Sequence, residues 1–132
     1  MSLRWYAVVV DCRDVVAQSR WWAEVLDWRV AYQAGNEVVL VPPHALDQTR
    51  VIPRSERGPG LVFVAVPEGK TLKNRLHIDL APSPDAGQEA EVRRLEDLGA
   101  SRVDIGQDSD QVSWVVMADP EGNEFCVLSA RE

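Results

Sequence analysis

The chain has 132 residues, of which 45% are hydrophobic and 27% charged, a composition typical of one ordinary globular domain. Its formal net charge of -7 argues against nucleic acid as a partner, because binding phosphates requires clustered lysine and arginine side chains. No apolar run approaches the roughly 20 residues that span a bilayer, and no secretory leader is evident, so we expect a cytoplasmic protein with no membrane partner.

The first half of the chain predicts five elements in the order strand, helix, strand, strand, strand. The helix begins after Asp14, a favourable N-cap residue, and continues to about Asp27. Its buried stripe is predicted to consist of Val15, Val16, Ser19, Trp22, Ala23 and Leu26. Apolar and β-branched residues place the four strands at residues 4–12, 28–34, 37–41 and 61–66.

Residues 42–60 form a connection that is longer than most loops in compact domains. It contains several prolines and three arginines, a composition that fits a binding loop or lid and equally fits a solvated excursion. His44 lies in this loop, within reach of a site formed by the strands, although a lone loop histidine is usually only solvated.

The second half of the chain repeats the order of the first. A helix is predicted at residues 85–98, and strands at residues 75–80, 101–105, 112–118 and 124–130. The Asp-Pro-Glu-Gly-Asn sequence at residues 119–123 favours a tight turn between the last two strands. We therefore expect an α+β fold, with one domain over residues 1–132 built from two βαβββ modules at about 4–67 and 74–130. Neither module can cover both faces of its own sheet, so the modules must pack or pair, within one chain or between chains.

Three local motifs accompany this repeated order. A Trp21-Trp22 pair lies in the first helix, a Leu-His-Ile-Asp-Leu strand at residues 76–80 opens the second module, and an Asp-Pro-Glu-Gly-Asn-Glu-Phe turn occupies residues 119–125. Together they resemble the vicinal oxygen chelate superfamily, and more narrowly its glyoxalase-like and bleomycin resistance protein-like members. The resemblance implies a cup formed by curved sheets, in which the first and last strands of each module carry the ligands of a divalent metal ion.

Two of the four ligand positions implied by this resemblance carry residues that cannot bind a metal, Ala7 and Val64. His77 occupies the third position, and Cys126 stands where the family has a ligand glutamate, so these two are the metal-ligand candidates. A catalytic zinc ion usually takes three protein ligands, and two would hold it only weakly. We therefore expect either no cofactor or a weakly held divalent metal.

Asp79 and Glu124 are the residues that would complete a shifted metal site, since each lies two positions from a candidate ligand on a predicted strand. A metal-free interpretation uses the same positions. Arg75, His77 and Asp79 alternate along one predicted strand, which indicates either a polar binding wall or an exposed sheet face. In a binding wall these three are the catalytic candidates: His77 acts as general acid or base, Asp79 or Glu124 fixes its tautomer, and Arg75 holds a substrate carboxylate.

The candidates for substrate binding are Trp5, Tyr32, Glu124 and Lys73. The two aromatic residues offer surface on which a flat ligand stacks. The strongest local basic patch consists of Lys70, Lys73, Asn74 and Arg75, and it would attract an anionic substrate or only balance nearby acids. Cys12 and Cys126 lack CxxC spacing and lie in apolar sequence, so we expect buried, reduced thiols.

Two classes of function follow from the residues and the resemblance. The first is a glyoxalase-like enzyme, a lyase or isomerase, that acts on a small molecule in the sheet cup with the usual metal site largely lost. The second is a non-catalytic protein that sequesters a small molecule or antibiotic, as bleomycin resistance proteins do. Glyoxalase I activity itself is not expected, because no complete metal site is present to stabilise an enediolate. The resemblance also implies a homodimer with a small-molecule ligand.

Overall fold

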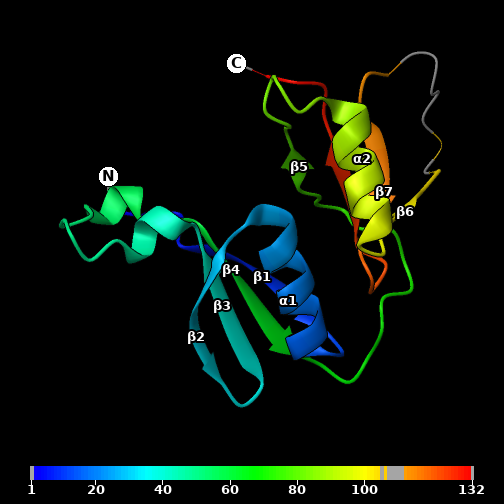
Figure 1. Ribbon diagram of the computed structural model, residues 1–132. Coiled ribbons are helices and arrows are strands. Elements are labelled where there is room, and N and C mark those ends of the chain that lie inside the picture. The colour runs from blue at the N-terminus through cyan, green and yellow to red at the C-terminus, as the bar shows by residue number, and fades with distance from the viewer. Residues whose placement is uncertain (1, 105, 107–111, 132) are drawn as a thin grey trace. The chain divides into compact units, whose positions relative to one another are not determined.

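The computed structural model of the protein describes residues 2–104, 106 and 112–131, and the chain divides into two compact units, Met1–Gly69 and Lys70–Glu132. Within the described residues, each unit contains one α-helix and one open, four-stranded mixed sheet (Figure 1). The predicted α+β fold of two strand-helix-three-strand modules is thus confirmed. Ile105, the end of one predicted strand, lies outside the described residues. Neither described helix has the length and apolar character needed to cross a membrane.

The sheet of the first unit has the strand order β1-β4-β3-β2, with β1 parallel to β4 and the other neighbours antiparallel. Its strands are β1 (Ala7–Cys12), β2 (Arg29–Ala34), β3 (Glu37–Val41) and β4 (Gly60–Ala65). Helix α1 (Val15–Leu26) packs against β3 and β4. Leu40 and Phe63 are fully buried, while the alternate residues of these strands point to the opposite face of the sheet.

Helix α1 begins and ends as predicted, because Asp14 accepts a hydrogen bond from the Ala17 backbone N–H at 3.0 Å and Asp27 ends the helix in the left-handed conformation. The predicted buried stripe is wrong in detail. The buried residues are Gln18, Ser19, Trp21, Trp22 and Val25, and Val16 is 38% exposed. The spacing 18, 21, 22, 25 is a regular helical stripe, but the polar Gln18 conceals it in the sequence.

The tryptophan pair belongs to the core of the first unit. Trp21 and Trp22 are both buried, with ring centroids 5.1 Å apart and ring planes at 82°. This edge-to-face arrangement is favoured for aromatic pairs and lets adjacent helix residues, which point about 100° apart, fill one core.

The second unit repeats the topology of the first, with the strand order β5-β8-β7-β6 and β5 parallel to β8. Its elements are β5 (Asp79–Leu80), α2 (Gln88–Asp97), β6 (Ser101–Arg102), β7 (Val115–Ala118) and β8 (Glu124–Val127). The strands are shorter than predicted. Between β7 and β8 the predicted turn is confirmed: Asp119 Oδ1 accepts hydrogen bonds from the backbone N–H groups of Glu121 and Asn123, both at 3.0 Å.

The predicted strand over residues 75–80 is wrong for its first part, since β5 contains only Asp79 and Leu80. Arg75 and His77 therefore lie in the segment that precedes the strand. The carbonyl of Ile78 still accepts a hydrogen bond from the Cys126 backbone N–H, at 2.9 Å. Further upstream, the backbone N–H of Asn74 is bonded to the Glu124 side chain, so side-chain contacts hold this segment in place of a strand ladder.

Candidate functional site

A pocket with a volume of about 380 Å³ lies in the first unit, on the face of the sheet that points away from α1. Its floor is formed by sheet residues on neighbouring strands: Ala7, Val39, Val41, Gly60 and Val62. The register explains why these residues meet, because Val39 pairs with Val62 and Ala7 pairs with Gly60. The floor is therefore apolar, and the volume falls in the range of small-molecule sites.

The wall of the pocket comes from two segments outside the sheet. Arg4 and Tyr6 belong to the arm before β1, and the long loop between β3 and β4 supplies Ala45, Leu46, Arg54, Arg57 and Gly58. This loop forms two short 3-10 helices, η1 (Pro43–Leu46) and η2 (Arg54–Glu56). Of the two interpretations of residues 42–60, the arrangement favours the binding loop. His44 lies outside the lining, and its Nε2 is 2.9 Å from the Glu56 carbonyl oxygen, which links η1 to η2.

Backbone carbonyls position two of the three arginines in this wall. Arg4 donates from Nη1 to the Arg54 carbonyl at 2.8 Å, and its guanidinium carbon lies 5.6 Å from the centre of the Tyr6 ring. Arg57 donates from Nε to the carbonyl of the buried Ile52, also at 2.8 Å. In the part of the chain that the structure describes, none of the three arginines forms an ion pair with a carboxylate.

A second cluster of chemically active side chains lies in the second unit. Potential ligand atoms of His77, Asp79 and Cys126 all lie within 4.8 Å of one another. His77 Nε2 is 3.3 Å from Asp79 Oδ1, and both side chains are about half exposed. Cys126 joins this pair because β5 and β8 are parallel neighbours and Asp79 lies opposite Cys126 in their register. The structure thus brings together three of the four residues predicted around a shifted site, and Glu124 is not among them.

The Cys126 thiol is not activated as a nucleophile. Burial, the negative charge of Asp79 and a hydrogen bond with Asp79 raise the pKa of this thiol, and the Lys73 charge opposes the effect only in part. A reactive cysteine requires a lowered pKa, so Cys126 is a packed thiol. Cys12 and Cys126 are both buried, and neither forms a disulfide within the described residues, as predicted.

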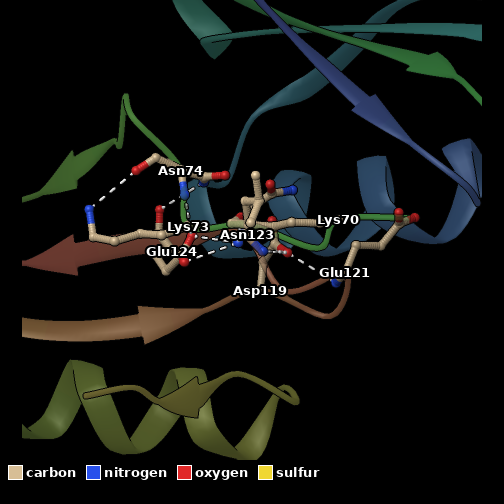
Figure 2. A network of polar contacts seen from close by, with 8 residues as sticks. Lys70, Lys73, Asn74, Asp119, Glu121, Asn123 and Glu124 are labelled. Atoms are coloured by element: carbon tan, nitrogen blue, oxygen red, sulfur yellow. Dashed lines mark hydrogen bonds and ion pairs between the residues drawn. The ribbon is translucent and has the colours of Figure 1, made fainter. Parts of the chain in front are cut away.

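Glu124 is the centre of a polar network at the start of the second unit (Figure 2). Its carboxylate lies 3.0 Å from Lys70 Nζ and accepts a hydrogen bond from the Asn74 backbone N–H at 3.1 Å. Burial alone would raise the pKa of Glu124, but the hydrogen bonds from Lys70 and Asn74 outweigh burial and lower it. Glu124 lies outside the cluster of His77, Asp79 and Cys126, and its oxygens are already engaged.

The remaining predicted binding residues lie at the surface. Trp5 is 68% exposed and donates to the Ala7 carbonyl at 3.3 Å, while Tyr32 on β2 is 54% exposed and pairs with Val39. Lys73 is exposed, with Nζ 3.2 Å from the Asn74 carbonyl oxygen, and Arg75 is also exposed. Neither Trp5 nor Tyr32 lines the pocket.

Sequence reasoning missed four residues of the pocket wall: Arg4, Tyr6, Arg54 and Arg57. The loop arginines carried a partial signal, because an unusually long loop rich in arginine was already a binding-loop candidate. The sequence of the N-terminal arm carried no such signal. Arg4 meets Arg54 across fifty positions of sequence, and no local pattern encodes such a contact.

Two βαβββ modules in one chain, each with its first and last strands parallel, define a protein of the vicinal oxygen chelate superfamily. The glyoxalase-like domain family matches residues 7–128, and the chain belongs to this family. A search of curated proteins returned no significant match.

Solved structures with the same fold are distant in sequence. An oxidase named ChaP-H2 is 16% identical, with a TM-score of 0.65 and coverage of 100% of this chain and 96% of the other. A glyoxalase/bleomycin resistance protein/dioxygenase family enzyme from Burkholderia phytofirmans is 16% identical, with a TM-score of 0.66 and coverage of 95% and 97%. A mutant of the fosfomycin resistance protein FosX from Listeria monocytogenes, complexed with Mn(II) and a dihydroxypropylphosphonic acid, is 10% identical, with a TM-score of 0.69 and coverage of 99% and 92%.

The residues of this chain do not fit the four-ligand metal site that the resemblance implies. Ala7 and Val64 offer no donor atom, and Ala7 forms part of an apolar pocket floor. A site of His77, Asp79 and Cys126 has the nitrogen, oxygen and sulfur donors that zinc accepts, but metal binding must first remove the proton from a thiol whose pKa is raised.

Proposed function

We propose that this protein binds a small molecule in the pocket of its first unit, without a metal ion and without catalysis there. The single observation that carries the proposal is the position of Ala7, which places a methyl group in the pocket floor where the resemblance implies a metal ligand. Val39 and Val62 continue this apolar surface. A floor of this kind favours binding of an apolar body and offers nothing to a metal ion.

The composition of the lining favours sequestration over catalysis. Within the described residues, no histidine, aspartate, glutamate, cysteine or lysine lines the pocket. General acid-base catalysis near neutral pH is most often performed by histidine or a carboxylate, and the ionisable side chains of this lining are three arginines and the exposed Tyr6. The bleomycin-resistance type of function, in which a small molecule is held and not converted, is therefore the form we favour.

A second candidate function rests on the convergence of His77, Asp79 and Cys126. In this alternative the second unit contributes to a glyoxalase-like lyase or isomerase reaction. His77 would transfer a proton, and Asp79, 3.3 Å away, would fix its tautomer. A zinc ion held by the three residues would polarise a substrate oxygen.

A thermal-shift screen of small organic molecules in the presence of EDTA tests the first proposal. A ligand at one hundred times its Kd stabilises a protein by about 2.7 kcal/mol, which for a domain of this size raises Tm on the order of 5–10 °C. We expect such shifts, unchanged by EDTA and retained in His77→Ala. A screen without any shift, or shifts that disappear with EDTA or in His77→Ala, would contradict metal-free binding in the first unit.

A matched pair of variants locates the binding site. Ala7→Leu adds three carbon atoms to the pocket floor, and we expect it to abolish the ligand-induced shift. Val9→Leu enlarges the next residue on the same face of β1, which lies outside the lining and is exposed, so it should leave the shift unchanged. Equal behaviour of the two variants would place the ligand elsewhere.

A further inference from the structure

Three arginines line one pocket of a protein whose formal net charge is -7. Arg4, Arg54 and Arg57 come from the N-terminal arm and from the long loop, and no acidic side chain lines the pocket in the described part of the chain. Gathering like charges without counter-charges is unfavourable unless a ligand supplies the opposite charge. This arrangement therefore points to an anionic occupant.

The linear sequence suggested a different basic patch, and the structure weakens that suggestion. Lys70, its first member, forms an ion pair with Glu124 at 3.0 Å, and both side chains are largely buried. Arg54, by contrast, has no side-chain hydrogen bond or ion pair within the residues that the structure describes. Lys70 is thus occupied by Glu124, whereas the Arg54 guanidinium group is available to a ligand.

The hydrogen bonds of the wall prepare the pocket for an oxyanion. Arg4 uses one Nη1 contact and Arg57 one Nε contact to backbone carbonyls, and a guanidinium group has five N–H donors. These contacts fix the two side chains while leaving further donors in the planar arrangement that matches a carboxylate or a phosphate. Because the groups are already positioned, less conformational entropy is lost when a ligand binds.

We propose that the ligand of this pocket is a small organic oxyanion, a carboxylate or phosphate carried on an apolar body. The guanidinium groups of Arg4, Arg54 and Arg57 bind the charged group, and the apolar body lies on the valine floor. This inference rests on the proposed function, since it names the chemical class of the small molecule. The volume of about 380 Å³ suits a compact molecule, such as one with a single ring.

Calorimetric titration with matched carboxylates and carboxamides tests the charge of the ligand. Benzoate, phenylacetate and 3-phenylpropanoate differ from their amides in charge while the shape is nearly unchanged. We expect at least one acid to bind about 10–100-fold more tightly than its amide, and its affinity to fall with added NaCl. Phenyl phosphate, titrated in parallel, distinguishes the two oxyanions: tighter binding than the acids assigns the phosphate class, and weaker binding assigns the carboxylate class.

Two arginine variants of the same loop provide the matched comparison. Arg54→Gln removes a guanidinium group of the pocket wall and should weaken the acid about 10–100-fold while leaving the amide unchanged. Arg50→Gln removes an exposed arginine that pairs with Asp47 outside the lining, and it should change the acid affinity less than twofold. Equal losses in both variants would overturn the assignment of the site.

The results also separate this inference from the function on which it rests. Amides that bind as tightly as acids, with both abolished by Ala7→Leu, would overturn the oxyanion while the pocket remains a binding site. The oxyanion is also overturned if no acid and no phenyl phosphate binds while other molecules give thermal shifts that Ala7→Leu abolishes. In that case too the pocket remains a binding site. If no molecule of any charge binds in a manner sensitive to Ala7→Leu, the proposed function fails as well.

Discussion

Replacement of Glu124 by Gln is expected to lower the free energy of unfolding at pH 7 by about 2–3 kcal/mol. The carboxylate receives hydrogen bonds from Lys70 Nζ and from the Asn74 backbone N–H, and the two side chains of the ion pair are only 18% and 11% exposed. Gln keeps the shape of the side chain but leaves the partly buried Lys70 ammonium group without its counter-charge. Loss of one partner of a buried pair is costly because the other charge remains desolvated.

The effect of Glu124→Gln should depend on pH in a defined direction. The pKa of Glu124 is lowered in the folded protein, so the folded state favours the ionised carboxylate. Its contribution to stability is therefore complete above the unfolded-state pKa of about 4.3 and disappears as the pH falls through the lower, folded-state pKa. The difference in stability between the wild-type protein and the variant should be constant from pH 8 to about pH 6 and shrink steadily below about pH 4.3.

Urea unfolding at a series of pH values measures this difference. Glu89→Gln is a suitable control, because Glu89 pairs with Arg93 at 3.5 Å on the exposed surface of α2. An exposed pair of this kind contributes about 0.3–0.5 kcal/mol. A loss in Glu124→Gln no larger than in Glu89→Gln, or a loss that grows as the pH falls, would show that the network does not hold residues 70–74 to β8.

Replacement of Gly60 by Ala is expected to cost about 1–3 kcal/mol of stability and to weaken ligand binding in the pocket. An added Cβ at this position would lie 2.9 Å from the Leu40 carbonyl oxygen, a backbone atom that cannot move alone. Gly60 also pairs with Ala7 and donates its N–H to the Tyr6 carbonyl at 3.1 Å. Separation of β3 from β4 at this point would therefore displace both the floor and the arm that carries Arg4.

The control for this variant is Gly69→Ala. A Cβ at Gly69 would meet only the flexible side chain of Arg13, at 3.4 Å, so the stability should change by less than about 0.5 kcal/mol. Thermal unfolding with and without a pocket ligand distinguishes the two positions. If Gly60→Ala were as stable as Gly69→Ala and bound ligand equally well, the close approach of the two strands at Gly60 would not be a requirement of the fold.

The sequence predicted the fold well wherever local signals were strong. The Asp14 N-cap, the end of α1 near Asp27 and the strand Glu37–Val41 are confirmed because capping chemistry and apolar period coincide there. Prediction failed at β5, where the alternation over residues 75–80 indicated a longer strand than is present. A side-chain contact from Glu124, fifty positions away, holds Asn74 and takes the place of strand pairing there.

The candidate site was predictable to the extent that it follows strand register. Alternation and the resemblance together pointed to His77, Asp79 and Cys126, and parallel pairing of β5 with β8 brings them within reach of one another. The pocket of the first unit was not predictable in this way. Its wall depends on how the long loop between β3 and β4 and the N-terminal arm lie over the sheet, and long-range contacts such as Arg4 with Arg54 decide that placement.

Native mass spectrometry of untagged protein, purified without chelators, tests metal-free binding most directly, since one spectrum reports bound metal and retained organic ligand together. We expect protein without metal, carrying a small organic acid or able to take up an added one, in the wild-type protein and in His77→Ala alike. A stoichiometric metal adduct that is lost in His77→Ala would contradict this account. It would move the function to the cluster of His77, Asp79 and Cys126.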